Sequence, residues 1–400
     1  TVQTALLRVV NDLLLASDSD ALSLLVLLDL KKAFDTVDHS VLINKLQLFK
    51  LSPSSLAWLH SYLEGRQQCV KVNGVMSDLC SNNMGVPQGS VLGPLLFTMY
   101  INDFPDSCQG ANCQLYADDT VIHLSTKTPA MAAQQLTLAL VDISKWFESS
   151  HLTLNMKKTV AVCFSIKTRP SDSTFEVSIN NEIIQEVKET RYLGIILDNN
   201  LKFQSQVKNV CKKVKSNLNC LRFIRRDLSQ QAALLYMHAM IFSHLSYCVT
   251  SWSQTSPSTL KPAVSVYKQA VKVFARKPMR SHHCDIIHRH NLFTFENFIH
   301  FSTLKLVFKC LNSHVSPLFS ALIISRQGSL RPSTRASVSG DCVLPRFTKS
   351  FGQSSFSFNG SRLWNSLPTN LKLQTDMISF NRSLKQWLKS SQSCTHGNAY

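Results

Sequence analysis

The stretch Cys113–Leu124, CQLYADDTVIHL, is the part of the sequence that decides the fold. Two short apolar runs, Cys113–Tyr116 and Thr120–Leu124, stand on either side of Ala117-Asp118-Asp119. This pattern predicts two antiparallel strands joined by a tight turn, with two adjacent carboxylates at its tip. Adjacent like charges repel, and a divalent cation that prefers oxygen ligands, such as Mg²⁺, removes that cost. Asp pairs are also common in turns that have no function, so the pair alone is weak evidence for a metal site.

A further carboxylate follows the most apolar segment of the chain. Leu24–Leu28 is an unbroken apolar run that ends at Asp29, and it predicts a strand buried on both faces. A carboxylate at a buried strand end, together with a carboxylate hairpin, is what a two-metal phosphoryl-transfer site requires. One ion activates an attacking 3′-hydroxyl and the other stabilises the leaving pyrophosphate. Spacing alone does not show that the two segments meet.

Strand and helix patterns alternate before residue 200 and predict an α+β fold, with helices packed on a mostly antiparallel sheet. Asn73-Gly74 is a strong hairpin signal between two strand patterns. The expected helices are 39–50, 52–65, 92–102 and 130–148, and further strands are expected at 160–166, 175–179 and 192–197.

After residue 200 the pattern is helical. Val207–Arg226 has apolar residues on one face and an adjacent basic stripe without acidic residues: Lys208, Lys212, Lys215, Arg222 and Arg226. A solvated surface and a nucleic-acid contact both explain such a stripe. The Ser-, Gly- and Arg-rich segment 325–361 is expected to be long and flexible.

The charge of the chain is strongly asymmetric. The net charge is +17 overall. Residues 1–198 carry 15 Lys and Arg against 20 Asp and Glu, whereas residues 199–400 carry 27 against 5. An acidic half and a strongly basic half indicate a cation site and a surface for a polyanion, of which nucleic acid is the obvious one. An anionic membrane surface and plain solubility remain alternative explanations of the charge. The apolar run 21–30 is too short to span a membrane.

Cysteine and histidine patterns carry little information about function. The twelve cysteines form no Cys-x-x-Cys pair, and reduced thiols of an intracellular protein are expected. His282-His283-Cys284 and His288-Arg289-His290 fit no common zinc finger. We interpret them as a solvated or nucleic-acid-facing basic loop in preference to a zinc site.

Five ordered motifs resemble those of LINE-type (non-LTR) retrotransposon reverse transcriptases, in their polymerase region. They are DLKKAFDTVDH (29–39), GVPQGSVLGPLLF (85–97), YADD (116–119), LNMKKT (154–159) and YLGIILD (192–198). The segment RLWNSLP (362–368) is also similar to vertebrate elements of this group, less specifically. The chain begins within a helix-like stretch, so the resemblance implies an amino-terminal truncation that removes most of the fingers region.

The resemblance implies a role for each matching position. Asp29, Asp118 and Asp119 would bind two Mg²⁺ ions, for which Mn²⁺ can substitute, and Lys158 would protonate the leaving pyrophosphate. Phe34 would exclude the sugar 2′-hydroxyl, and Gln88-Gly89 would lie against the incoming nucleotide and template. The segment 193–198, beginning at Leu193 and Gly194, would grip the primer.

Each of the softer assignments has a plain alternative. Phe34 also fits a core position, and Gln88-Gly89 also fits an ordinary turn before a helix. Lys158 also fits a surface lysine beside Lys157.

The resemblance also implies a right-hand polymerase. Partial fingers and a palm would occupy 1–200, a helical thumb 201–262, and a basic, partly helical region 263–400. Its function would be RNA-directed DNA synthesis on an RNA template from a DNA primer or nicked target DNA, with dNTPs, in a ribonucleoprotein of the nucleus and cytoplasm and without membrane partners. A catalytically inactive nucleic-acid-binding relic without a complete dNTP site is the alternative. A host-adapted splicing or telomere cofactor is a third.

Overall fold

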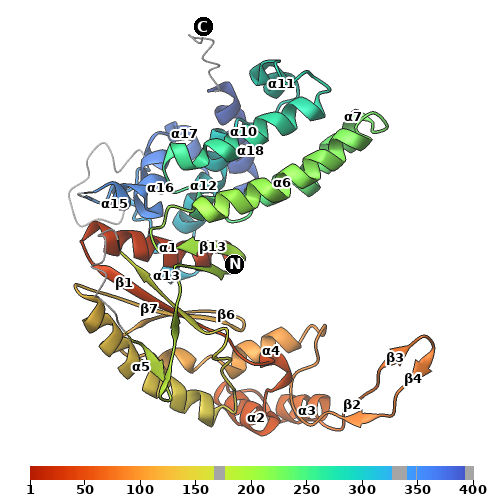
Figure 1. Ribbon diagram of the computed structural model, residues 1–400, viewed down its shortest axis with the longest axis vertical. Coiled ribbons are helices and arrows are strands. Elements are labelled where there is room, and N and C mark those ends of the chain that lie inside the picture. Colours follow the sequence, from red (N-terminus) through yellow and green to blue (C-terminus); the bar gives the residue numbers. More distant parts are fainter. Residues whose placement is uncertain (166–175, 327–339, 348, 392–400) are drawn as a thin grey trace. The chain divides into compact units, whose positions relative to one another are not determined.

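The computed structural model describes residues 1–165, 176–326, 340–347 and 349–391 (Figure 1). It is a mixed α+β chain with a helical C-terminal half. The chain divides into two compact units: residues 21–190, here called the sheet unit, and residues 1–20 with 191–400, here called the helical unit. The helix α1 (Val2–Asp18) thus groups with the C-terminal half, which differs from the predicted boundary of 1–200. A division between 262 and 263 stays a prediction.

The sheet unit is built on a five-stranded sheet of order β11-β8-β1-β7-β6. Its strand pairs are antiparallel apart from the edge pair β11-β8, which is parallel. The sheet is therefore mixed, and the prediction that most of it is antiparallel is confirmed. Residues 166 and 175 of the expected strands lie outside the described part. The strands of the unit are β1 (Leu22–Leu28), β2 (Gln67–Gln68), β3 (Lys71–Val72), β4 (Val75–Met76), β5 (Cys80–Ser81), β6 (Asn112–Tyr116), β7 (Asp119–Thr126), β8 (Val160–Phe164), β9 (Ser178–Ile179), β10 (Glu182–Ile183) and β11 (Gln185–Glu186).

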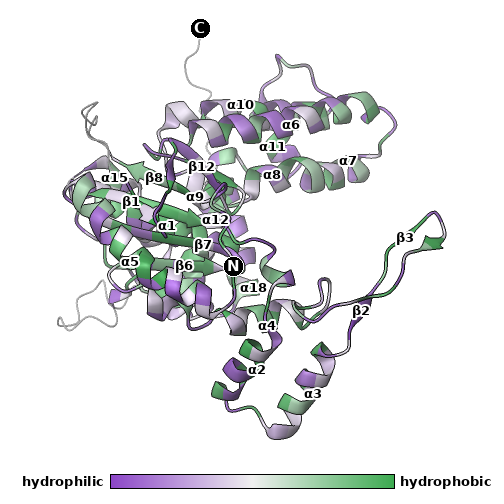
Figure 2. Ribbon diagram, turned by 60° about the horizontal axis from the view of Figure 1, so that its bottom comes forward, coloured by the Kyte–Doolittle hydropathy of each residue, from purple (hydrophilic) through white to green (hydrophobic). Residues whose placement is uncertain are grey.

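The strand β1 is the central strand of the sheet. Its apolar side chains point to both faces of the sheet, and a central strand is covered on both. Six of its seven residues are buried, as its continuous apolar run predicts. Leu24 and Val26 belong to the same core as Leu136 and Leu140 of α5 (Pro129–Ser149). Full burial of each such side chain contributes roughly 1.5–3 kcal/mol. Figure 2 shows the apolar character of the central strands.

Shorter helices and a hairpin complete the sheet unit. The helices are α2 (His39–Leu48), α3 (Pro53–Leu63) and α4 (Gly93–Tyr100), with the short 3₁₀ turns η1 (Ala33–Asp35) and η2 (Phe104–Ser107). The predicted hairpin is confirmed, since β3 pairs with β4 around Asn73-Gly74, which both have positive φ.

The helical unit contains one hairpin and the helices that follow it. Two strands, β12 (Glu189–Tyr192) and β13 (Ile195–Asp198), form the hairpin where the unit begins. The helices are α6 (Gln204–Ile224), α7 (Gln230–Tyr236), the π-helical η3 (Met237–Phe242), α8 (Ser243–Ser246), α9 (Val249–Trp252), α10 (Pro257–Phe274), α11 (His283–Arg289), α12 (Phe295–Leu311), α13 (Pro317–Ser320), α15 (Ser350–Ser354), α16 (Phe356–Asn365), α17 (Thr369–Lys372) and α18 (Met377–Ser390).

The segment 325–361, predicted to be flexible, is helical in most of its described residues from 350 onward. They form α15 and the start of α16, and Phe356 is fully buried in a core that includes Trp364 and Phe380. Phe356 and Trp364 lie on the buried face of α16 together with Ser357, Gly360 and Ser361, whose small side chains allow close helix packing. Among the described residues, no helix is both long enough and apolar enough to cross a membrane.

Candidate active site

Three carboxylates meet at one end of the sheet. The register between β1 and β7 pairs Leu28 with Thr120, so the next position places Asp29 opposite Asp119. The β6–β7 hairpin closes with Tyr116 paired to Asp119, and Ala117-Asp118 forms its turn. Ala117 has a φ of 53°, which shows how tight the turn is. Antiparallel pairing thus brings together the two segments whose meeting the sequence left open.

The clustered charge acts on Asp119. Partial burial raises the pKa of Asp119, and the neighbouring carboxylates of Asp118 and Asp29 raise it further. Among the described residues, the group whose possible ligand atoms all lie within 4.8 Å of one another is His282, His283 and Cys284. The three carboxylates are spread more widely, so they do not form a tight, preassembled metal site. Oxygen donors that repel one another at a partly exposed strand end fit a divalent cation, which would offset the repulsion.

The LNMKKT segment holds Asp29 in place through its backbone. The Asp29 amide donates to the Thr159 hydroxyl at 3.3 Å, and the Asp29 carbonyl accepts from the Asn155 amide at 2.7 Å. Lys158 Nζ lies 3.8 Å from Asp29 Oδ2, and its side chain is 70 % exposed. The two adjacent lysines therefore have different surroundings: Lys158 lies beside Asp29, whereas Lys157 lines a pocket.

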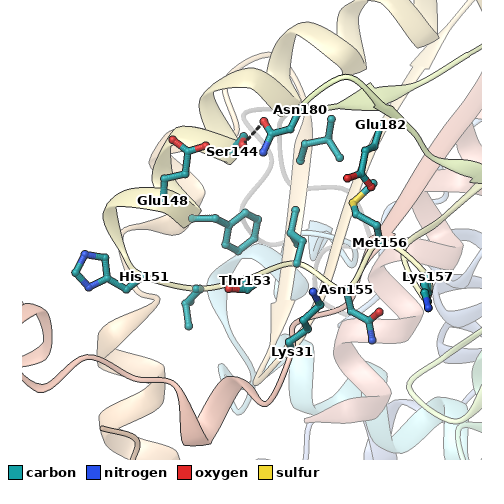
Figure 3. Close-up of a pocket in the computed structure, with 14 residues that line it drawn as sticks. Lys31, Ser144, Glu148, His151, Thr153, Asn155, Met156, Lys157, Asn180 and Glu182 are labelled. Atoms are coloured by element: carbon teal, nitrogen blue, oxygen red, sulfur yellow. Dashed lines mark hydrogen bonds between the residues drawn. The ribbon is translucent and has the colours of Figure 1, made fainter. Parts of the chain in front are cut away.

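That pocket, of about 850 Å³, lies beside the same segment (Figure 3). At one end Ser144 Oγ donates to Asn180 Oδ1 at 2.6 Å, and Lys31 and Asn155 lie at the other end. None of the three carboxylates and neither Phe34 nor Gln88 lines it.

Phe34 and Gln88 are brought together by a docked loop. Phe34 is half-buried on η1 and stacks on Phe97, with ring centroids 4.5 Å apart. The Val86 amide donates to the Phe34 carbonyl at 2.8 Å, and Gln88 Nε2 donates to Asp35 Oδ1 at 2.7 Å. Asp35 was missed by the sequence reasoning, although it lies in the DLKKAFD motif one position after Phe34.

The loop needs glycine at Gly85. This residue has a φ of 83°, and a Cβ there would lie 2.7 Å from the Asp35 carbonyl oxygen. Gly89, with a φ of 78°, has no atom within 4 Å of the corresponding position.

The expected primer-grip residues form the turn between β12 and β13. Leu193 and Gly194 both have positive φ, at 45° and 80°. The Tyr247 hydroxyl donates to the Leu193 carbonyl at 2.9 Å, and its ring lies 3.3 Å from the position of a Cβ on Gly194. Trp252 Nε1 in turn donates to the Tyr247 carbonyl at 2.9 Å. No local sequence pattern pointed to Tyr247, because this contact spans 54 residues.

The basic stripe lies on the exposed side of α6. Lys208, Lys212, Lys215 and Arg222 are exposed, and Arg226 is exposed just beyond the end of the helix. The opposite face is buried as predicted. Arg222 also lines a groove of about 590 Å³ together with three lysines of α10: Lys261, Lys268 and Lys272. The sequence reasoning missed these lysines, although their spacing of seven and four residues places them on one helical face.

The His282-His283-Cys284 side chains converge more than the sequence suggested. Their possible ligand atoms all lie within 4.8 Å of one another. Burial lowers the pKa of His283 to about 4, with Lys268, His282 and Lys272 contributing. Structural zinc sites use four ligands, and nearby ammonium groups oppose a cation. We therefore do not assign a zinc site here.

Comparison with known proteins agrees with this geometry. Residues 6–197 match the family described as reverse transcriptase (RNA-dependent DNA polymerase). The sheet unit with its three carboxylates thus lies within a reverse transcriptase domain.

Individual relatives show which reverse transcriptases this chain is similar to. The probable RNA-directed DNA polymerase from transposon BS of Drosophila melanogaster is 33 % identical over 227 residues, which cover 54 % of this chain and 24 % of that protein. The RNA-directed DNA polymerase from mobile element jockey of the same species is 33 % identical over 211 residues, 51 % of this chain and 22 % of that protein. The domain is therefore related to the RNA-directed DNA polymerases of non-LTR retrotransposons. The chain spans about a quarter of the length of these relatives.

A solved structure of telomerase from Candida tropicalis, in complex with a TWJ fragment of telomeric RNA, is more distantly similar. The match covers 74 % of this chain and 49 % of that chain, with a TM-score of 0.36 and 13 % identity. A likeness of this degree supports no further argument.

Proposed function

We propose that the chain is an RNA-directed DNA polymerase that extends a primer 3′-hydroxyl with dNTPs on an RNA template. The observation that supports this most directly is the placement of Asp29 opposite Asp119, with Asp118 in the adjoining turn. In this assignment the sheet unit is the palm with partial fingers, and α6 begins the thumb. The template and the DNA primer, or nicked target DNA, are the nucleic-acid partners.

Asp29, Asp118 and Asp119 would hold two Mg²⁺ ions, or Mn²⁺ in their place. When bound, such ions lower the pKa of the primer hydroxyl and neutralise the charge that develops on the phosphates. The carboxylates would approach the ions from the end of β1 and from the β6–β7 turn. The hydrogen bonds of the Asp29 backbone to Thr159 and Asn155 fix the position of Asp29 relative to the LNMKKT segment.

Lys158 would donate a proton to the pyrophosphate as it leaves. Its ammonium group is exposed and lies 3.8 Å from Asp29 Oδ2, so it reaches the edge of the carboxylate site while remaining open to a substrate. General-acid assistance of this kind contributes roughly 10²- to 10⁴-fold in rate.

Phe34 would select the sugar of the nucleotide. Stacking on Phe97 fixes the ring, and a fixed ring excludes an extra hydroxyl better than a mobile one. Gln88 and Gly89 lie on the loop that docks against the same turn, so the two elements can bound one nucleotide-binding surface.

The test is primer extension on an RNA template with dNTPs and Mg²⁺. We expect extension by the wild type and by Asp106→Asn, a change at an exposed acid of the same unit, and none by Asp118→Asn. Absence of extension by all three, with salt-sensitive RNA binding retained, would replace the proposal with a non-catalytic nucleic-acid-binding protein.

A further inference from the structure

A cluster of lysines and aromatic rings lies between α12 and α18, far in sequence from the reverse transcriptase match. Phe293 and Phe301 are half-buried, and their ring centroids lie 5.3 Å apart. Lys305 Nζ and Lys385 Nζ lie 5.4 and 5.6 Å from the centroid of the same Phe301 ring. Lys389 Nζ lies 5.5 Å from the Phe293 centroid. We call these residues, with Lys309, the lysine–phenylalanine cluster.

The cluster concentrates positive charge without an acidic partner. In the described part of the chain, none of its lysines makes an ion pair with an Asp or Glu. Burial lowers the pKa of Lys305, and the charges of Lys309 and Lys385 lower it further. Burial and then Lys385 lower the pKa of Lys389. Like charges held together in this way are unfavourable alone and become favourable when a polyanion binds.

The two helices hold the cluster firmly. Asn297 Nδ2 of α12 donates to the Leu388 carbonyl of α18 at 2.7 Å, and the hydroxyl of Tyr267 in α10 donates to the Phe293 carbonyl. Phe293 and Phe301 also pack against the core around Phe308 and Phe380. The positions of the rings and ammonium groups are therefore set by the fold before any ligand binds.

We propose that the lysine–phenylalanine cluster is a second nucleic-acid site, which binds a single strand by its phosphates and by one or two of its bases. The lysines from both helices would contact successive phosphates, and an unstacked base would displace an ammonium from a phenylalanine face and stack there. A duplex offers no free base faces, so a single strand fits this surface better. Half-buried rings cannot insert into a bilayer, which disfavours an anionic membrane as the ligand.

The experiment measures binding of fluorescein-labelled (U)₂₀ RNA and (dT)₂₀ DNA to the full chain by fluorescence anisotropy, in EDTA and over a range of salt. The cluster variant carries Lys305→Gln, Lys385→Gln and Lys389→Gln. The matched control carries Lys50→Gln, Lys127→Gln and Lys188→Gln, three exposed lysines of the sheet unit that change the net charge equally.

We expect the cluster variant to bind at least tenfold more weakly at 0.15 M salt, and its salt slope to fall by about 2 relative to the control. Phe301→Leu should weaken binding about fivefold or more, because a stacking surface is lost. Replacement of the same three lysines by arginine should restore binding, which separates lost charge from lost folding. A stronger effect on one of the two oligonucleotides identifies RNA or DNA as the ligand.

Equal affinities and salt slopes for the cluster variant and the control would overturn the proposal. An unchanged affinity of Phe301→Leu would overturn the assignment to a single strand. Binding to phosphatidylserine vesicles that is lost in the cluster variant, with oligonucleotide binding intact, would overturn it in favour of a membrane surface. The readout is binding in EDTA, so failure of the proposed polymerase activity would leave this result interpretable.

Discussion

At the scale of single residues, Asp119 connects the proposed chemistry with stability. Its pKa is raised by partial burial and by two neighbouring carboxylates, so its ionised form is disfavoured in the folded state. A raised folded pKa favours folding at low pH, and this contribution is lost as pH rises through the folded pKa. The ionised cluster therefore lowers stability at neutral pH in the absence of a cation.

We predict that Asp119→Asn raises the stability of the metal-free chain at pH 7, by up to about 1 kcal/mol. The gain should shrink towards zero as pH falls below the raised pKa of Asp119, because the wild-type carboxyl is then protonated. Thermal unfolding in EDTA between pH 4 and 7 measures this difference. Added Mg²⁺ should raise the melting temperature of the wild type more than that of the variant. A variant that is less stable at pH 7 would contradict the electrostatic explanation.

The residue scale also shows where sequence reasoning reached its limit. The identities of Asp29, Asp118 and Asp119 could be predicted from motifs, because each stands beside a strand pattern. The roles of Asp35 and Tyr247 could not, because Gln88 and Leu193, their partners, are 53 and 54 residues away. Lys157 and Lys158 are equivalent in the sequence, and only the fold places one of them beside Asp29.

At the scale of elements, the loop that begins at Gly85 shows how backbone conformation positions the residues that we propose to contact the nucleotide. The Gly85 amide donates to the Val37 carbonyl at 2.7 Å, and its carbonyl accepts from His39 Nε2 at 2.7 Å in the tautomer that donates there. The sequence predicted a glycine loop before a helix, and α4 confirms the helix. The sequence could not predict that this loop packs against η1, where the Val86 amide donates to the Phe34 carbonyl.

We predict that Gly85→Ala destabilises the chain by about 3 kcal/mol, and Gly89→Ala by about 1 kcal/mol. Both substitutions place a Cβ at positive φ, which costs roughly 1–2 kcal/mol. Only the first also pushes a Cβ into the Asp35 backbone, so it adds an overpacking cost. Urea denaturation of the two variants measures the difference. Equal midpoints would mean that the loop is not docked on η1 as described.

The fold was most predictable where a periodic pattern was long. The α5 and α6 helices were expected within one to three residues of their observed ends, because their apolar faces repeat over five to six turns. The helices of segment 350–361 were not predicted, because Ser and Gly dominate its composition and the packing depends on the buried side chain of Phe356. Composition is thus a poorer guide than the spacing of a few aromatic residues.

At the scale of the whole molecule, positive charge is concentrated in the helical half and forms two different surfaces. The α6 stripe, with the groove lined by Arg222 and the α10 lysines, consists mainly of cations, with Phe223 as an exposed aromatic ring beside Arg222. The lysine–phenylalanine cluster combines cations with aromatic rings. A surface in which cations predominate suits the regular phosphates of a duplex, whereas paired rings beneath the cations suit the unstacked bases of a single strand.

We therefore predict that substitutions in the two surfaces separate the two kinds of ligand. Lys208→Gln, Lys212→Gln and Lys215→Gln together should lower the salt slope for a blunt primer–template duplex by about 3, because each lost phosphate contact removes about 0.9. The same variant should change the slope for (U)₂₀ little, and the cluster variant should behave in the opposite way. Anisotropy titrations of both variants with both ligands test this. If each variant weakened both ligands equally, the basic half would act as one unspecific polyanion surface, and the distinction between cation array and aromatic cluster would have no functional meaning.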